Sequence, residues 1–224
     1  MIVAEGLRKC FGRVTALDGV SIRVAPGERV ALLGHNGAGK STLMKLLGGH
    51  LLPGEGSVHI AGASVADAPD AARRALGYVP EEPECWGYLS ARETLEYVVA
   101  VRGGGDIEAA LALIGLGADA DRLVREYSQG MRRKVAIAAA LVANPPALVF
   151  DEALNGLDPP STLAIAEELR RRADAGTAVL VSTHVIDLVP RIATRVVVLR
   201  AGRVELDSPL DALGAGGLEG VFGG

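Results

Sequence analysis

Short runs of apolar residues recur along the chain, and each is long enough for one strand of a sheet. Four of these runs are rich in Val, Ile and Leu, and they lie at 30–33, 147–150, 179–181 and 196–199. Runs that are apolar on both faces are typical of strands buried in a parallel sheet. Longer stretches with helical spacing separate them, at 40–47, 130–142 and 161–173. This alternation predicts a doubly wound α/β core.

The beginning of the chain departs from this alternation. Residues 2–24 predict short strands around the turn Phe11-Gly12-Arg13. A further strand is expected at 57–60, after the loop Pro53-Gly54-Glu55-Gly56. Together these segments predict a small antiparallel sheet beside the core.

The middle of the chain is different again, because its pattern is helical from about 83 to 144. Glycine-rich breaks interrupt the helices at 103–105 and 115–117. This predicts a helical subdomain inserted between two core strands. The stretch after Asp207 is rich in glycine and predicts a loose end, with a packed turn at 218–222.

Composition supports one packed domain over residues 1–224. Hydrophobic residues make up 49% of the chain and aromatic residues 4%, which suits a globular core. The formal net charge of -4 argues against a nucleic-acid partner. The longest unbroken apolar run, 135–143, is far shorter than the roughly 20 residues that a membrane-spanning helix needs. We expect a soluble chain whose membrane role, if it has one, comes through a partner.

Cysteine usage and the N-terminal residues predict a cytoplasmic location. Cys10 and Cys85 belong to no metal-binding pattern, and we expect them to be free, buried thiols in a reducing compartment. Glu5, Arg8 and Lys9 interrupt the apolar stretch that a signal peptide would need.

A phosphate loop is the strongest local signal. The sequence GHNGAGKST fits the pattern GxxxxGK[ST], between a predicted strand and a predicted helix. Glycines let backbone N–H groups point at phosphate oxygens, and the start of the helix adds its positive dipole end. Lys40 is expected to reach the β and γ phosphates, and Ser41 to ligate Mg²⁺. The predicted nucleotide-binding residues are Gly34, His35, Asn36, Gly37, Ala38, Gly39, Lys40, Ser41 and Thr42.

The nucleotide is expected to be ATP, because the Asn-Lys-x-Asp motif of GTP-specific domains has no counterpart here. An acidic pair, Asp151 and Glu152, follows the strand at 147–150. Strands of this type of sheet present ligands at their carboxyl ends. Asp151 is therefore placed to hold Mg²⁺ and Glu152 to orient or deprotonate the attacking water. The alternative, a solvated acidic turn, does not explain the pair beside a phosphate loop.

The segment Tyr127-Ser128-Gln129-Gly130-Met131 resembles the signature of ATP-binding cassette (ABC) ATPases. The resemblance runs from Phe11 to His184 in the order of that family. It implies that two cassettes close head to tail on two ATP molecules. In that arrangement Ser128 and Gly130 touch the γ-phosphate held by the opposite subunit.

The same resemblance assigns three further residues. Phe11 is similar to the aromatic residue that stacks on adenine, although a core aromatic is the alternative. Asp158, in Asn155-Gly156-Leu157-Asp158, resembles the key acid of a loop that crosses the dimer interface. His184 resembles the switch histidine that contacts the γ-phosphate and holds the water with Glu152.

Three departures from the family pattern stand out. Glu81 occupies a position usually held by Gln, where a carboxylate can still ligate Mg²⁺ or a water but alters the local charge. Gln129 and Met131 replace the usual Gly and Gln of the signature. Ala153-Leu154 replaces Pro-Thr after the expected catalytic Glu, and we expect no change of chemistry from this.

The segments YVPEE and YSQGMRRK resemble the exporter branch of the family (ABC-2, multidrug and antibiotic efflux), whose membrane subunits are separately encoded. The resemblance therefore implies the ATPase subunit of a membrane exporter, bound to the inner face of the membrane through such subunits. Trp86-Gly87-Tyr88 is expected either to anchor a membrane subunit or to pack inside the helical subdomain.

Two alternatives remain open. One is a soluble ABC ATPase acting on a ribosome, DNA or a protein complex, against which the single phosphate loop and the lack of a coiled-coil insertion count. The other is a regulatory cassette that hydrolyses ATP poorly, which Glu81 favours and the retained Lys40, Asp151, Glu152 and His184 oppose. The transported substrate is not encoded in these motifs.

Overall fold

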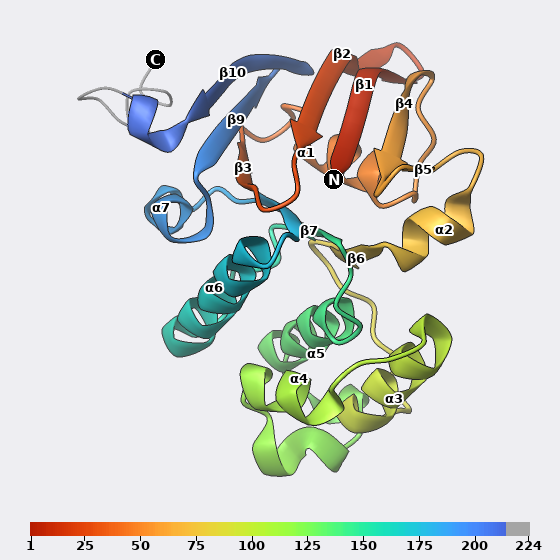
Figure 1. The fold of residues 1–224 in the computed structure, drawn as a ribbon, viewed down its shortest axis with the longest axis vertical. Coiled ribbons are helices and arrows are strands. Elements are labelled where there is room, and N and C mark those ends of the chain that lie inside the picture. Colours follow the sequence, from red (N-terminus) through yellow and green to blue (C-terminus); the bar gives the residue numbers. More distant parts are fainter. Residues whose placement is uncertain (214–224) are drawn as a thin grey trace.

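Two sheets and a set of helices make up residues 1–213, the part of the chain that this computed structural model describes (Figure 1). The smaller sheet is antiparallel, with the strand order β2-β1-β4-β5. Its strands are β1 (Ile2–Phe11), β2 (Val14–Val24), β4 (Glu55–Ile60) and β5 (Ala63–Ser64). The predicted antiparallel sheet is thus confirmed.

The larger sheet has the order β10-β9-β3-β8-β7-β6, and all its neighbours are parallel except β10 and β9. Its strands are β3 (Arg29–Leu33), β6 (Leu76–Val79), β7 (Ala147–Asp151), β8 (Ala178–Ser182), β9 (Arg195–Arg200) and β10 (Arg203–Pro209). Every residue of β7 and β8 is buried, as expected for strands covered on both faces. The predicted parallel core is confirmed.

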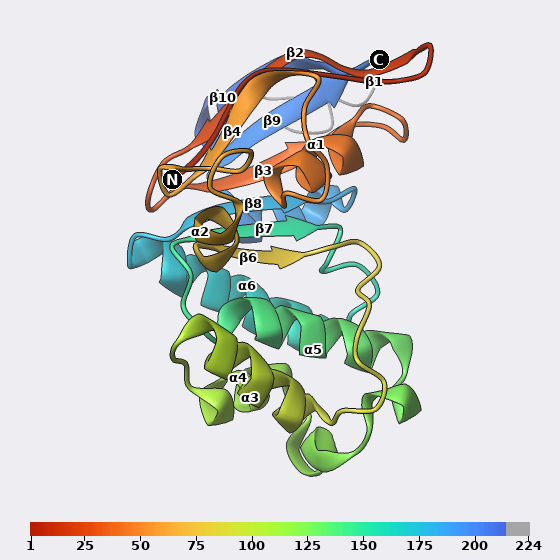
Figure 2. The same cartoon turned by 90° about the vertical axis from the view of Figure 1, so that its right-hand side faces the viewer.

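Helices cover both faces of this sheet (Figure 2). The helices of the described chain are α1 (Lys40–Leu47), α2 (Pro69–Arg74), α3 (Ala91–Arg102), α4 (Ile107–Ile114), α5 (Gln129–Leu141), α6 (Pro159–Asp174) and α7 (Val189–Ile192). Val149 and Leu180 pack with α1 and the antiparallel sheet, whereas their neighbours Leu148 and Val179 pack with α6 and α7. The alternation of side chains along each strand thus divides the core into two layers.

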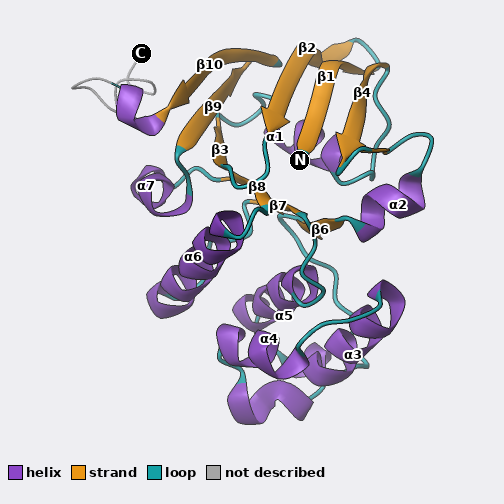
Figure 3. Ribbon diagram, in the orientation of Figure 1, coloured by secondary structure: helices purple, strands orange, loops and turns teal. Residues whose placement is uncertain are grey.

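Helices α3 and α4 pack with one side of α5 in a third apolar cluster and project away from the sheets (Figure 3), whereas Ile137 and Leu141 of α5 also pack in the layer beneath the large sheet. In sequence they lie between β6 and β7. Ser90 starts α3 with a reciprocal capping box to Glu93. Gly103 and Gly115 end α3 and α4 with φ of 86° and 64°, which explains the predicted glycine breaks.

Short 3-10 turns complete the described chain, at η1 (Gly117–Asp121), η2 (Val124–Glu126), η3 (Ile186–Leu188) and η4 (Leu210–Ala212). The prediction of a loose end after Asp207 is wrong for the first residues of that segment. β10 continues to Pro209 because it pairs with β9, and η4 follows. The turn expected at 218–222 lies outside the described residues, so the domain limits 1–224 stay a prediction.

Two further expectations are corrected or limited by the structure. Cys10 is exposed rather than buried, since it lies next to the turn of the β1–β2 hairpin, while Cys85 is partly buried; both are free. Among residues 1–213, no helix combines the length and the apolar character that crossing a membrane requires.

Candidate functional site

The loop between β3 and α1 takes a path that two glycines make possible. Gly34 has φ of 152°, and a Cβ on it would lie 2.5 Å from the carbonyl oxygen of Leu199. Gly39 has φ of 106°, and a Cβ there would lie 2.6 Å from the carbonyl oxygen of Ala16. Any larger residue at either position would force backbone to move. Neighbouring strands therefore hold the loop close to its observed shape.

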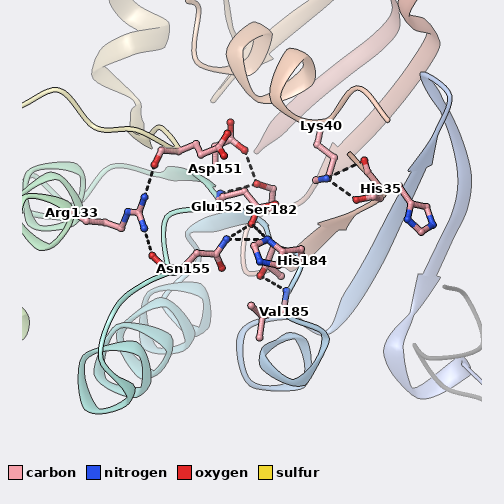
Figure 4. A network of polar contacts seen from close by, with 12 residues as sticks. His35, Lys40, Arg133, Asp151, Glu152, Asn155, Ser182, His184 and Val185 are labelled. Carbon is pink, nitrogen blue, oxygen red and sulfur yellow. Dashed lines mark hydrogen bonds and ion pairs between the residues drawn. The ribbon is translucent and has the colours of Figure 1, made fainter. Parts of the chain in front are cut away.

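Lys40 begins α1, and its side chain is buried beneath the loop (Figure 4). Its Nζ donates to the carbonyl oxygen of Gly34 at 2.6 Å and lies 3.4 Å from that of His35. The ammonium group thus sits inside the curve of the loop. Positive charge and the helix N-terminus coincide there, which favours a phosphate group.

A cavity of about 520 Å³ opens over this loop. Glu81 and Glu152 enter it from other segments, so the structure brings these predicted residues to the phosphate loop. The lining residues are Val14, Thr15, Ala16, His35, Asn36, Gly37, Ala38, Gly39, Lys40, Ser41, Thr42, Glu81 and Glu152.

Asp151 is the last residue of β7 and is only 2% exposed. Its Oδ1 accepts a hydrogen bond from Ser182 Oγ, at the end of neighbouring β8, at 2.7 Å. Burial raises the pKa of Asp151 and outweighs this hydrogen bond, which lowers it, while the charges of Glu81 and Glu152 raise it further. A cation would relieve the repulsion among these carboxylates.

Glu152 follows with φ of 49°, a conformation that costs a non-glycine residue roughly 1–3 kcal/mol. Its backbone N–H donates to Ser182, with the Oγ at 2.9 Å and the carbonyl oxygen at 3.2 Å. These bonds turn the chain so that the Glu152 carboxylate points toward His184, whose Nδ1 lies 2.9 Å from Oε2 (Figure 4). The strained backbone conformation of Glu152 therefore directs its carboxylate to His184.

Asn155 joins the same pair. Its Nδ2 donates to Glu152 Oε2 and lies 3.2 Å from His184 Nδ1. Since Oε2 accepts from Asn155, a proton on His184 Nδ1 gives the carboxylate a second donor. The three side chains form one polar network at the carboxyl edge of the sheet.

The residues expected to hold Mg²⁺ have the right chemistry for it. Asp151 and Glu81 offer carboxylate oxygens and Ser41 a hydroxyl, all hard ligands. Within residues 1–213 no cluster of three or more His, Cys, Asp and Glu forms a complete protein cage. Mg²⁺ usually binds one or two side chains together with substrate phosphates and waters.

Ser128 and Gly130 lie elsewhere, at the N-terminus of α5. Ser128 caps the helix, its Oγ accepting from the N–H of Met131 at 3.2 Å. A Cβ on Gly130 would meet nothing closer than 3.8 Å, so packing inside the chain does not require glycine there. Among the described residues that line the phosphate cavity, none comes from α5.

Asp158 caps α6 and is tied to α5. Its Oδ1 accepts from the N–H of Ser161 at 2.9 Å, and its Oδ2 lies 2.8 Å from Lys134 Nζ. Hydrogen bonding from Lys134, followed by that from Ser161, holds the pKa of Asp158 far below its usual range. The predicted interface acid is therefore an ionised helix cap in this chain.

Phe11 lies at the rim. It pairs with Val14 at the end of the β1–β2 hairpin, and about half of the side chain is exposed. Val14 lines the phosphate cavity but Phe11 does not. Lys9 Nζ lies 5.7 Å from the centre of its ring. Phe11 is thus not a core residue, and its stacking on adenine stays a prediction.

Sequence reasoning missed two members of the site as individual residues. The sequence assigned no role to Ser182, and it placed Asn155 only within an interface loop. Ser182 ends the strand beside β7, and Asn155 lies three residues after Glu152, signals that could have suggested them. Arg133, which donates to the carbonyl oxygens of Asn155 and Glu81, gave no sequence signal.

A strand, phosphate loop and helix with an acidic strand end define the class of phosphate-loop nucleoside triphosphatases. Within this class, residues 17–155 match the family model described as ABC transporter. The chain belongs to this family, so the predicted ABC ATPase resemblance is confirmed.

Similar proteins also support the family assignment. The daunorubicin/doxorubicin resistance ATP-binding protein DrrA of Streptomyces peucetius is 36% identical over 91% of this chain and 63% of its own length. The methionine import ATP-binding protein MetN of Brucella abortus is 34% identical over 94% of this chain and 60% of its own length. The chain thus spans somewhat less than two thirds of these relatives.

Solved structures agree as well. A structure described as the ATP binding subunit of an ABC transporter superposes with a TM-score of 0.93 at 31% identity, over 99% of this chain and 98% of the other. A dimeric cassette in a post-hydrolysis state with ADP and Pi has a TM-score of 0.84 at 26% identity, over 94% of this chain and 99% of the other. The predicted fold, with core, antiparallel sheet and helical region, is confirmed.

Proposed function

We propose that this chain is the ATP-hydrolysing subunit of a membrane exporter, and that it works as a dimer that closes on ATP. Closure moves separately encoded membrane subunits, and hydrolysis reopens the dimer. The chain then lies on the cytoplasmic face of the membrane. The export direction rests on the drug-resistance relatives and on the exporter-like segments around Glu81 and Ser128, since an import protein is also among the relatives.

The incompleteness of the site within one chain carries this proposal. The phosphate loop and Glu152 line one cavity, and His184 contacts Glu152, whereas Ser128 and Gly130 at the start of α5 do not line it. A helix N-terminus capped by Ser128, beside a glycine that no internal contact requires, is suited to a phosphate from another molecule. A second copy of the chain supplies what the first one lacks.

In the closed dimer the residues of one chain act on the γ-phosphate and on water. Glu152 accepts the proton of the attacking water, and His184 and Asn155 hold its carboxylate in place. Lys40 and the loop N–H groups stabilise the charge on the phosphate oxygens. Mg²⁺ bound near Ser41, Asp151 and Glu81 supplies further charge neutralisation.

An aromatic patch on the helical region, defined by Trp86, Tyr88 and Tyr97, offers the site for a membrane subunit. The Trp86 and Tyr97 rings meet edge to face at 4.8 Å between centroids, yet each is about half exposed, and Tyr88 is 82% exposed. They line an open cavity of about 600 Å³. Large, rigid, apolar side chains of this kind are common interface anchors.

Mixing two defective chains tests the shared site. Lys40→Ala disables the phosphate loop and Ser128→Arg disables the α5 terminus. Each variant alone should lack ATP hydrolysis. A mixed dimer still contains one intact pair of Lys40 and Ser128, so activity should return on mixing. No recovery, with both variants folded and able to associate, would overturn the two-chain site.

The transport role needs a separate experiment. The chain is purified by affinity from gently solubilised native cells, and its partners are identified by mass spectrometry. We expect a protein with several membrane spans in near equal amount, and its loss with Trp86→Ala and Tyr88→Ala together. Recovery of ribosomal proteins, DNA or soluble complexes alone would replace the exporter with a non-transport ABC ATPase.

A further inference from the structure

Arg133 connects three separate segments of the chain. It lies on α5, three residues after Gly130, and its guanidinium reaches out of the helical region (Figure 4). Nη1 donates to the carbonyl oxygen of Asn155, in the loop after β7. Nη2 donates to the carbonyl oxygen of Glu81, after β6, at 2.7 Å. One side chain thus ties α5 to two loops that border the phosphate cavity.

This arrangement differs from an ordinary surface ion pair. Within residues 1–213, no carboxylate lies within ion-pair distance of Arg133, and its Nε is buried without a hydrogen-bond partner. An unpaired buried N–H lowers stability. The planar fork of arginine suits two carbonyl groups held at a fixed separation, which a lysine cannot match. The contact is therefore better suited to fixing geometry than to stabilising the fold.

Of the two contacts, the one with the carbonyl oxygen of Asn155 bears directly on Glu152. The amide of Asn155 donates to Glu152 and lies beside His184, so the position of its backbone decides where that amide lies. Gly156 follows with φ of 72°, and a Cβ there would be 3.3 Å from Arg133 Nη1. The guanidinium is thus packed directly against this turn. Moving Arg133 would move the hydrogen-bond donor that Glu152 relies on.

We propose that Arg133 is a positioning residue for ATP hydrolysis, which aligns Glu152 with His184 through Asn155. The inference rests on the proposed ATPase function and adds a physical connection to it. Since Arg133 lies one helical turn from Gly130, a γ-phosphate that draws in the α5 terminus also moves the Arg133 fork. Engagement of the second chain and alignment of Glu152 then occur together.

Arg132 provides a matched control. It is the preceding residue on α5, and its guanidinium also donates to two carbonyl oxygens, those of Val124 at 3.3 Å and Arg125 at 2.9 Å. Both acceptors belong to the helical region itself. Loss of Arg132 therefore removes the same chemistry without touching Asn155 or Glu81.

The test compares Arg133→Met, Arg133→Lys and Arg132→Met in the full chain, by steady-state ATP hydrolysis and thermal unfolding. Arg133→Met should lower kcat about tenfold or more with KM for ATP unchanged, a typical effect of losing a supporting contact. Arg133→Lys should be intermediate and Arg132→Met near the parent. Equal kcat for Arg133→Met and the parent, or equal losses in both Met variants, would overturn the proposal.

A double substitution asks whether Arg133 acts through Asn155. If it does, Arg133→Met combined with Asn155→Ala should lower kcat no further than the more damaging single change. Losses that multiply would contradict this route.

The imidazole NMR signals of His184 give a readout that does not need turnover. They should shift in Arg133→Met and stay in place in Arg132→Met; unchanged signals in both would reject the coupling. A parent chain that hydrolyses no ATP would instead refute the proposed function, and the NMR comparison would still decide the role of Arg133.

Discussion

Asp151 and Ser182 end strands that are buried along their whole length, whereas Ser128 and Trp86 belong to a helical region with its own small core and exposed aromatic side chains. At the sheet edge, polar side chains are held by contacts within the chain. In the helical region, few contacts within the chain explain why Ser128 and Trp86 are the residues found at these positions. The first region is built to bind and react, and the second to meet other molecules.

The contacts of each region support this difference. Asp151, Glu152 and His184 are joined by hydrogen bonds that run between strand ends. Polar contacts that connect the two regions include those of Arg133 and Lys134, which reach from α5 to the loop that holds Asn155 and Asp158. Arg102 of α3 adds another by donating to the carbonyl oxygen of Leu76 in β6. Defined polar contacts therefore join the sheet edge to the helical region, and substitutions can probe the two regions separately.

The largest effect is expected at the sheet edge. Glu152→Gln should lower the rate of ATP hydrolysis by about 10²–10⁴-fold, because the amide cannot accept the proton of water. ATP binding should persist and the dimer should accumulate, as measured by size-exclusion chromatography with light scattering. Hydrolysis at the parental rate would remove Glu152 from the reaction.

The next largest effect is expected from core deletions, which should affect stability and ATP affinity differently in the two regions. Leu95→Ala empties part of the helical cluster and should lower the free energy of unfolding by about 2–5 kcal/mol. ATP affinity should not change, because Leu95 lies outside the layers around the phosphate loop. Leu180→Ala in β8, a matched deletion in the layer that contains α1, should reduce both stability and ATP affinity. Urea unfolding and titration with a fluorescent ATP analogue measure these quantities. Equal loss of ATP affinity in both variants would erase the proposed separation.

Gly130→Ala should move stability and activity in opposite directions. The methyl group fits the chain, so the variant should gain about 0.4–1 kcal/mol in the free energy of unfolding. In the proposed dimer this methyl group would meet the nucleotide of the opposite subunit, so ATP hydrolysis should nevertheless fall severalfold. Assays of both quantities on one preparation provide the check. Unchanged hydrolysis would leave the α5 terminus without a role in the dimer.

The smallest effect concerns the contact of Asp158 with Lys134. The pKa of Asp158 is depressed in the folded chain, so its carboxylate contributes stability above the pKa of the unfolded state. That contribution disappears as pH falls through the folded pKa. Asp158→Asn should therefore be less stable than the parent near neutral pH, and the difference should shrink as the solution becomes acidic. A difference independent of pH, measured by urea unfolding, would assign the effect to helix capping alone.

Much of the site could be predicted because the relevant residues are close together in sequence. The phosphate loop is one continuous segment, and its glycines, Lys40 and Ser41 appear in the order that the backbone requires. Strands β7 and β8 were predicted from apolar runs, which indicated where Asp151 and His184 would lie. Strand β10 was missed although Val204 and Leu206 alternate with charged residues, and only the structure shows the pairing with β9 that makes this short segment a strand.

The sequence by itself determined the class of fold and ATP as the nucleotide, and it predicted the residues that surround the phosphates. Only the tertiary structure revealed that Asn155 joins Glu152 and His184, that Lys134 keeps Asp158 ionised, and that Arg133 spans α5 and two loops. The physical reason is the range of the interactions. Periodicity and loop motifs follow from neighbours along the chain, whereas these contacts join segments that only the packing of α5 against the sheet brings together.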